Sequence, residues 1–436
     1  MEVVSSETIK PSFPTPAHLR SHKLCLCDQL SPVFYIPLVL YYPMPHALVT
    51  TGAADVTRRL KSSLSLVLAR FYPLAGRIKD NFLIECNDEG VKFVETRADC
   101  RLSELLVSPD PSLLNMLLPI EMESPEASTG FLFLVQVNFF TCGGLAMGMC
   151  ISHKVADGFT LSDLITSWAK LSTGEEIVSK PPRFDASTFF PPSSCLQALP
   201  VVELPKEKSV TRRFVFDPSN ISELVAMARS EHVPHPTRLE VVCALIWRCV
   251  TLASRRSTRA FGERSVFSQA VNIRPRMSPP LSESTVGDLV VVFLAEAESG
   301  KGEDDLSLRE LVRKLREEKE EFLGNFMRKE MAGEAATGAL LRMAETVGGL
   351  LKGGGVELYS SSSWCGFPVY DADFGWGKPV WVSLVSMAFK NTIIIMNKRG
   401  GEGMEVWLTL TEDHMAEVDR DEEVHRLATV NPGIDW

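Results

Sequence analysis

The 436-residue sequence has no apolar run long enough to cross a membrane and no excess of positive charge. A membrane helix needs about 18 or more consecutive apolar residues, and no stretch of the chain reaches that length. The formal net charge of -10 argues against nucleic acid as a partner, because phosphate backbones are bound by basic surfaces. Residues 1–13 contain Glu2 and Glu7 and no apolar core segment, unlike a secretory signal. We therefore expect a cytoplasmic protein with neither a membrane nor a nucleic-acid partner.

Three common functional signatures are also missing. The sequence has no Gly-x-Ser-x-Gly elbow, which disfavours a hydrolase with a serine nucleophile. The glycines at 353–355 are not followed by Lys-Ser or Lys-Thr, which excludes a phosphate-binding loop. Ten cysteines are scattered without metal-type spacing, and His232 and His235 have no third ligand nearby. We therefore predict no metal site and reduced core thiols.

Residues 150–158 contain the first candidate catalytic residue, His153. This stretch follows an apolar region, 131–149, whose alternation around two glycines predicts two strands joined by a tight turn. Apolar residues then recur at helical spacing, with Thr160 and Asp163 placed as a capping box. His153 thus lies on a strand-to-helix connection. A neutral imidazole there is suited to taking a proton from a hydroxyl or an amine at cellular pH.

Asp157, four residues after His153, has two interpretations. It can orient the imidazole through the second ring nitrogen, as the aspartate of a Ser-His-Asp triad does. Alternatively, it turns away into a salt bridge that holds the loop, and the neighbouring Gly158 suits such a turn. A His-x-x-x-Asp spacing also arises by chance in a chain of this length, so the spacing alone does not establish catalysis.

A second stretch, residues 363–379, contains the rare string Asp373-Phe374-Gly375-Trp376-Gly377. Together with the stretch from His153 to Gly158, and in the same order and separation, it resembles the plant BAHD family of coenzyme A-dependent acyltransferases. The resemblance covers nearly the whole chain. Residues 28–30 and 184–192 are most similar to the vinorine synthase-like group of that family.

The resemblance implies an α/β fold of two similar domains with mixed β-sheets flanked by helices. This fold is chloramphenicol acetyltransferase-like, with an active-site channel at the domain interface. A chain of 436 residues also exceeds the size at which a single core keeps growing. A proline-rich stretch, 179–205, reads as a linker. We place an N-terminal domain with the His motif at 1–180, a crossover linker at 181–210, and a C-terminal domain with the Asp-Phe-Gly-Trp-Gly motif at 211–436.

The resemblance also assigns roles to individual residues. It makes His153 the general base and pairs Asp157 with Arg274, which favours the salt-bridge interpretation because a guanidinium can pin the loop across the domain junction. Asp28 matches a position close to the family's catalytic channel, which makes it a supporting residue. A turn aspartate before Pro32 explains Asp28 equally well.

The motif from Asp373 to Gly377 is expected to be structural. Paired glycines around an aromatic residue suit a tight turn, Asp373 can accept hydrogen bonds from nearby backbone amides, and none of the five residues is a good nucleophile. The family likewise treats this motif as a structural element away from the reacting atoms.

Two positions depart from the family's pattern. Asp288 follows Gly287 where relatives usually have asparagine, which turns a side chain that can donate a hydrogen bond into an acceptor. Gly366 stands where relatives usually have arginine, so a contact to substrate or cofactor is missing. The Tyr-Phe-Gly-Asn-Cys signature of anthocyanin malonyltransferases is absent, which disfavours malonyl transfer to a flavonoid glucoside.

The resemblance implies an acyl-CoA-dependent O-acyltransferase that moves an acetyl or other short acyl group to a hydroxyl of a plant specialised metabolite. His153 would remove the acceptor's proton, the oxygen would attack the thioester, and coenzyme A would leave without a covalent acyl-enzyme. We expect a monomer with acyl-CoA as co-substrate and no permanently bound cofactor. An N-acyltransferase and a catalytically silent small-molecule-binding relative are the alternatives. Intact His153 and Asp157 argue against the silent relative, whereas Asp288 and Gly366 keep it open.

Overall fold

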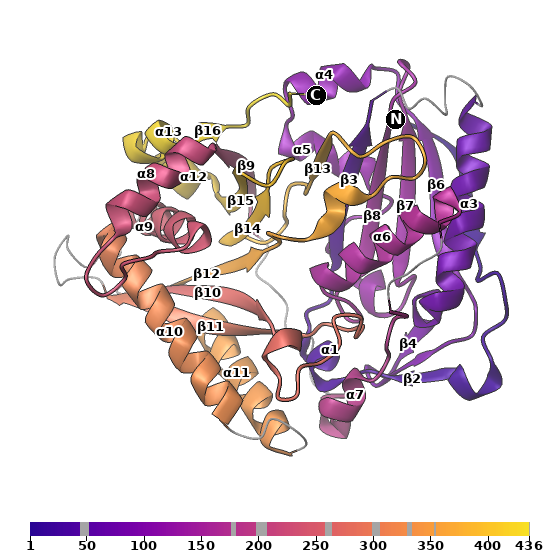
Figure 1. Cartoon of the computed structure of the whole chain (residues 1–436), viewed down its shortest axis with the longest axis horizontal. Helices are drawn as coiled ribbons and strands as arrows, with labels where there is room; N and C mark the ends of the chain where they lie inside the picture. Colours follow the sequence, from indigo (N-terminus) through magenta and orange to yellow (C-terminus); the bar gives the residue numbers. More distant parts are fainter. Residues whose placement is uncertain are drawn as a thin grey trace.

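The computed structural model describes residues 1–43, 52–175, 180–197, 207–257, 264–298, 306–328, 334–352 and 355–435. The chain forms two large mixed β-sheets, each with helices packed against it, and the two sheets occupy opposite halves of the molecule (Figure 1). The expected α/β architecture of two mixed-sheet domains with flanking helices is therefore confirmed. Part of the predicted linker, 198–206, lies outside the described residues.

Within the described residues, the first large sheet has six strands in the order β1-β6-β7-β8-β3-β13. These strands are β1 (Glu2–Ile9), β6 (Val91–Arg97), β7 (Phe133–Phe139), β8 (Leu145–Ser152), β3 (Tyr35–Tyr42) and β13 (Trp381–Ser383). β6 and β7 run parallel, and the other neighbours are antiparallel. Two long helices, α3 (Gly52–Arg70) and α6 (Gly158–Thr173), lie together at this sheet (Figure 1). The indole of Trp168 in α6 donates to the Leu60 carbonyl of α3, which ties the two helices together.

The second large sheet has seven strands over the described residues, in the order β11-β10-β12-β14-β15-β9-β16. Its strands are β11 (Val290–Glu298), β10 (Arg264–Asn272), β12 (Val356–Ser363), β14 (Thr392–Asn397), β15 (Met404–Thr411), β9 (Ser209–Phe216) and β16 (Thr429–Val430). The helices of this half are α8 (Pro218–Ala228), α9 (Arg238–Ser257), α10 (Leu308–Arg328), α11 (Glu334–Lys352), α12 (Glu412–Val418) and α13 (Glu422–Leu427). Most of α9 is buried, so this helix forms the centre of the second core.

Shorter elements accompany the two large sheets. A small sheet contains β2 (Ser21–Lys23), β5 (Leu83–Glu85) and β4 (Arg77–Lys79). The short helices are α1 (Leu26–Leu30), α4 (Leu102–Val107), α5 (Pro111–Leu114) and α7 (Ala186–Phe189). Buried Cys25, Leu26 and Cys27 belong to the second hydrophobic core although they lie near the start of the chain. The N-terminal segment therefore crosses to the other half.

The predicted strand pair before His153 is confirmed as β7 and β8. They pair antiparallel from Phe133 opposite Ile151 to Phe139 opposite Leu145, and Gly143 in the turn has a φ of +84°. Every residue of β8 is buried. A strand covered on both faces is expected to be apolar almost throughout, which explains why its sequence lacks polar alternation.

A C-terminal segment lies with the first sheet. β13 pairs with β3, and Phe374 belongs to the first hydrophobic core. The sequence-based division assigns both to the domain at 211–436, so the chain returns to the first half after it has built most of the second. For the remaining residues the proposed domain limits stay a prediction.

Candidate active site

His153 is placed at the end of β8, at the junction of the two halves. Its backbone N–H donates to the carbonyl of Phe34 at 3.0 Å, and the Phe34 ring meets the imidazole edge-on at 4.9 Å between centroids. The side chain is 21% exposed, but its Nδ1 atom is covered by protein. The exposed part of the imidazole is therefore the remainder of the ring, which includes Nε2. Ser152 is buried and donates to the Ala127 carbonyl, which leaves its hydroxyl engaged.

Asp157 caps the helix that follows. Its Oδ1 atom accepts from the backbone N–H of Thr160 at 2.8 Å, and α6 begins at Gly158. The predicted capping box at Thr160 and Asp163 is therefore wrong, because the extended backbone of Asp157 places its carboxylate at the helix start first. We refer to residues 153–157 as the histidine loop.

The Asp157 carboxylate also meets Arg274, which follows β10 in the other half. Arg274 Nη1 donates to Asp157 Oδ2 at 2.7 Å and Nη2 to Oδ1 at 3.3 Å, and both side chains are buried. Burial opposes ionisation of Asp157, but Arg274 and the amide of Thr160 outweigh it and lower its pKa. Arg274 in turn donates to the carbonyls of Thr285 and Gly287. Asp157 is thus engaged with Arg274, and the pair fastens the histidine loop to the second half.

A different aspartate, Asp288, lies beside the imidazole. Its Oδ2 atom is 3.3 Å from Nδ1 of His153. The backbone N–H of Asp288 donates to Oδ1 of Asp28 at 2.8 Å, and Oδ2 of Asp28 accepts from the backbone N–H of Cys25 at 2.8 Å. Asp28 lies within α1 and holds the segment that carries Asp288. Burial raises the pKa of Asp28 to about 6.

Lys154 and Ser31 complete this buried group, and sequence reasoning missed both. Lys154 Nζ donates to the carbonyls of Gln29 and Ser31, and burial lowers its pKa to about 8. The Ser31 hydroxyl donates to the Asp288 carboxylate. The one available signal was that Lys154 directly precedes the apolar pair Val155 and Ala156, because a lysine drawn into a buried segment needs a polar partner.

The motif from Asp373 to Gly377, which we call the tryptophan loop, is held by its own aspartate. Asp373 Oδ1 accepts from the backbone N–H groups of Gly375, Trp376 and Gly377 at 2.7, 3.1 and 2.9 Å. The two glycines have φ values of +97° and +100°, a region that favours glycine. Phe374 is fully buried against Trp168 of α6. The loop thus packs into the core of the first half.

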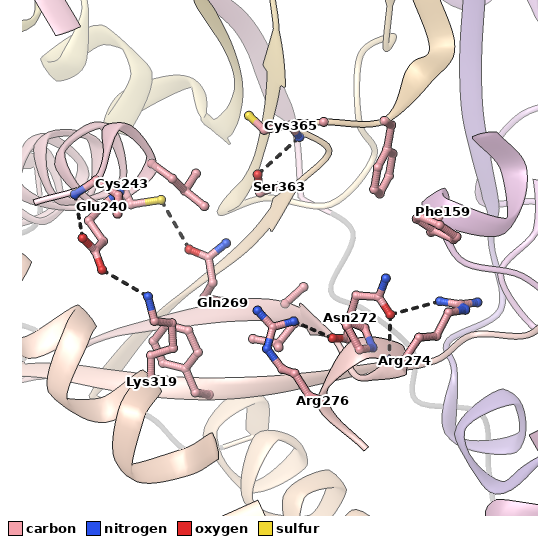
Figure 2. A pocket seen from close by; sticks show the side chains of 18 of the residues that line it. Phe159, Glu240, Cys243, Gln269, Asn272, Arg274, Arg276, Lys319, Ser363 and Cys365 are labelled. Atoms are coloured by element: carbon pink, nitrogen blue, oxygen red, sulfur yellow. Dashed lines mark hydrogen bonds and ion pairs between the residues drawn. The ribbon is translucent and has the colours of Figure 1, made fainter. Parts of the chain in front are cut away.

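A cavity of about 430 Å³ lies mainly in the second half, and its wall includes Phe159, which follows the histidine loop in α6 (Figure 2). Arg274 and Phe159 line it, and the Arg274 guanidinium lies 5.1 Å from the Phe159 ring centroid. The wall carries charges of both signs, and Lys319 pairs with Glu240 at 3.1 Å. Gly366 also lines the cavity, and a Cβ atom added there would meet nothing within 4 Å. The space around Gly366 is therefore open.

Neither a metal centre nor a membrane span is found in the parts of the chain that the structure describes. No three His, Cys, Asp or Glu side chains among these residues are grouped so as to hold a metal ion. Of the helices in the same residue ranges, none combines the length and apolar character that crossing a membrane requires.

Comparison with known proteins places the whole chain in one family. The family model described as "Transferase family" matches residues 1–425. Stemmadenine O-acetyltransferase of Catharanthus roseus is 36% identical and covers 97% of this chain and 96% of its own length. Limonoid 7-O-acetyltransferase of Citrus sinensis is 35% identical, over 100% of this chain and 99% of its own.

Solved structures show the same fold. The crystal structure of vinorine synthase superposes with a TM-score of 0.83 at 34% identity and covers 98% of both chains. F. graminearum TRI101, solved with coenzyme A and T-2 mycotoxin, superposes with a TM-score of 0.72 at 17% identity and covers 94% of this chain and 99% of its own. At that identity the second likeness concerns the fold alone.

Proposed function

The chain belongs to the Transferase family, the BAHD acyltransferases, and from this premise we propose that it transfers an acetyl or other short acyl group from coenzyme A to a hydroxyl of a plant specialised metabolite. Relatives named as O-acetyltransferases act in plants, which supports oxygen as the acceptor atom and acetyl as the acyl group. Transfer to an amine is the alternative within the same chemistry.

The observation that carries this proposal is the placement of His153. The imidazole has Nδ1 covered and its other edge exposed, on a loop that Asp157 and Arg274 fasten to the second half. A base with one free nitrogen at a junction between two sheets can meet an acceptor and a donor that arrive from different directions.

In the proposed reaction, neutral His153 accepts the proton of the acceptor hydroxyl at Nε2 while the oxygen attacks the thioester carbonyl carbon. The tetrahedral intermediate collapses, the carbon–sulfur bond breaks, and the coenzyme A thiolate takes the proton from His153. The acyl group passes directly to the acceptor, and the enzyme carries no covalent intermediate. General base catalysis of this kind contributes about a hundred- to ten-thousandfold in rate.

The cavity lined by Phe159 and Arg274 is the site we assign to one of the two substrates. Arg274 belongs to its wall and also pairs with Asp157 of the histidine loop, and the wall contains both apolar and polar residues. Its mixed charge provides no single basic patch for the phosphates of coenzyme A, so this wall suits the acyl end of the donor or the body of the acceptor.

We further propose that the enzyme acts as a cytoplasmic monomer, with acyl-CoA as a co-substrate and no permanently bound cofactor. The scattered cysteines, several of them buried as free thiols, support a reducing compartment.

Turnover tests the proposal directly. Purified native protein and His153→Ala would be incubated with acetyl-CoA, other short acyl-CoAs and a panel of plant alcohols and amines, while free thiol and the product mass are recorded. We expect acceptor-dependent thiol release with an ester of the matching mass from the native protein, and at least a hundredfold less from the variant. Native protein that binds acyl-CoA but releases no coenzyme A with any acceptor would contradict it and favour the silent relative.

A further inference from the structure

The carboxylate of Asp288 lies beside the covered side of the His153 imidazole. Nδ1 of His153 and Oδ1 of Asp288 are both buried, and neither has an aligned hydrogen-bond partner within the described part of the chain. Oδ2 of Asp288 lies 3.3 Å from Nδ1, within ion-pair distance. Because buried polar atoms are rarely left unpaired, the Asp288 carboxylate is the acceptor in reach of the Nδ1 atom of His153.

The carboxylate of Asp288 is held in place from several sides. Its backbone N–H is bound by Asp28, and the Ser31 hydroxyl donates to Oδ2. Asp28 itself is fixed by the N–H of Cys25 at the start of α1. Asp288 therefore presents its carboxylate to the ring from a supported position, which is the requirement for orienting a catalytic side chain.

The other aspartate near the ring is engaged elsewhere. Both oxygens of Asp157 accept from Arg274, and they also accept from the amides of Thr160 and Leu289. Asp157 thus has its acceptor capacity filled by donors other than the imidazole. Asp288, and not Asp157, is therefore the aspartate placed to orient the imidazole through Nδ1, as the aspartate of a triad does.

We propose that Asp288 is a positioning residue for His153: its carboxylate accepts the Nδ1–H of the neutral imidazole, fixes the ring, and leaves the lone pair of Nε2 directed at the acceptor. This inference rests on the proposed function, in which His153 is the general base. It also gives a role to the aspartate that stands where the family usually has asparagine.

The charges around His153 determine the pH at which it works. Asp288 approaches the ring from the segment before β11, and Asp157 adds negative charge from the start of α6. Asp28 of α1 and Lys154 of the histidine loop interact in turn with Asp288. Burial alone would lower the pKa of His153, but the charge of Asp288, together with Asp157, outweighs burial and raises it. Since only the neutral ring accepts a proton, activity should fall as the pH drops through this raised value.

Asp288→Asn tests the assignment by removing the charge and keeping the shape. We expect the acidic limb of kcat/KM to move to lower pH by about one unit, because a nearby opposite charge raises a pKa by about that amount. We also expect the plateau to fall roughly tenfold. Asp163→Asn removes a negative charge from α6 and should leave both unchanged. A purely structural role for Asp288 would change the folded fraction without moving the limb.

A second measurement needs neither activity nor a variant at 288. The chain has eight histidines, and labelling their rings with ¹³C and ¹⁵N allows the signals to be followed by NMR, with His153→Ala to assign His153. The native neutral ring should carry its proton on Nδ1. In Asp288→Asn its titration midpoint should fall by about one unit.

The outcomes separate the two proposals. A native ring protonated on Nε2, or a titration midpoint that is equal in native protein and Asp288→Asn, would overturn the role of Asp288. The expected tautomer and shift in a protein that forms no ester would refute the proposed function but support the pairing of Asp288 with His153.

Discussion

The histidine loop and the tryptophan loop are both short turns rich in polar or glycine residues, yet they are built for different tasks. The histidine loop is fastened by long-range contacts, since Asp157 pairs with Arg274 and His153 faces Asp288, each from the second half. The tryptophan loop is fastened by its own Asp373, which accepts hydrogen bonds from three backbone N–H groups of the next four residues. The histidine loop depends on the junction between the halves. The tryptophan loop depends on its own turn and on helices of the first half, since the Phe374 carbonyl also accepts from the Ser172 hydroxyl of α6.

This difference indicates where function resides. A residue that must meet two substrates has to lie at the junction, and its loop needs partners that fix it there. The tryptophan loop carries Phe374 into the first core against Trp168, so its sequence is restricted by packing and by backbone conformation. The two motifs are equally conspicuous in the sequence, but only the first presents a titratable group that can perform chemistry.

The largest effect is expected from Arg274→Met. It leaves the carboxylate of Asp157 buried without its cation, which typically costs about 3–5 kcal/mol in the free energy of unfolding, here measured by urea denaturation. Adding Asp157→Asn to the same chain should recover part of the loss, because the unpaired charge is removed. A loss below about 1 kcal/mol, typical of an exposed pair, would show that the junction does not depend on this contact.

Asp373→Ala should have the next largest effect, and on the other loop. Three backbone amides lose their shared acceptor, so we expect a loss of about 1–3 kcal/mol in the free energy of unfolding. Asp371→Ala is a matched control two residues away, since its pair with Lys378 is more than half exposed and should matter by less than about 0.5 kcal/mol. Equal effects of the two substitutions would contradict the structural role of Asp373.

Titration of Asp28, which supports the site around the histidine loop, should make the stability of the protein depend on pH. The pKa of Asp28 in the folded protein, about 6, lies above that of an unfolded aspartate. The folded state therefore binds the extra proton, and this contribution to stability increases as the pH falls through 6.

Between pH 7 and pH 5 the native protein should gain about 1.4 kcal/mol relative to Asp28→Asn. Urea midpoints measured at both pH values check this difference. Parallel changes in the two proteins would show that Asp28 does not titrate in this range.

The smallest predicted effect comes from Gly377→Ala. The site has space for a Cβ atom, so only the φ of +100° opposes the substitution, at a cost of about 1 kcal/mol. Gly324→Ala in α10 makes the same chemical change where the helix favours alanine, and it should raise the melting temperature instead. Changes of the same sign at both sites would show that backbone conformation does not restrict the tryptophan loop.

Local signals predicted the elements around the site. The glycine break and apolar run gave β7 and β8, helical spacing gave α6, and His153 does leave the end of β8. The helix start was misplaced because Asp157 and Thr160 are both good caps, and spacing alone does not decide which comes first.

Contacts between distant segments could not be predicted from such signals. The sequence does not show that Asp288 lies beside His153, because the two segments are far apart in the chain and belong to different halves. The pairing of β13 with β3 is equally hidden, since three residues carry no register information without their neighbour. The facing of Asp157 and Arg274 was anticipated from the family resemblance and not from the pattern of either segment.

The most direct test compares the two loops in one assay. Initial rates of acyl-CoA-dependent ester formation would be measured side by side for native protein, His153→Ala and Asp373→Ala, with each rate divided by the folded fraction from thermal unfolding. We predict that His153→Ala keeps the native melting temperature and loses at least a hundredfold in rate, whereas Asp373→Ala melts earlier but has a near-native rate per folded molecule. A fully folded His153→Ala that retains activity within tenfold of native would contradict the account.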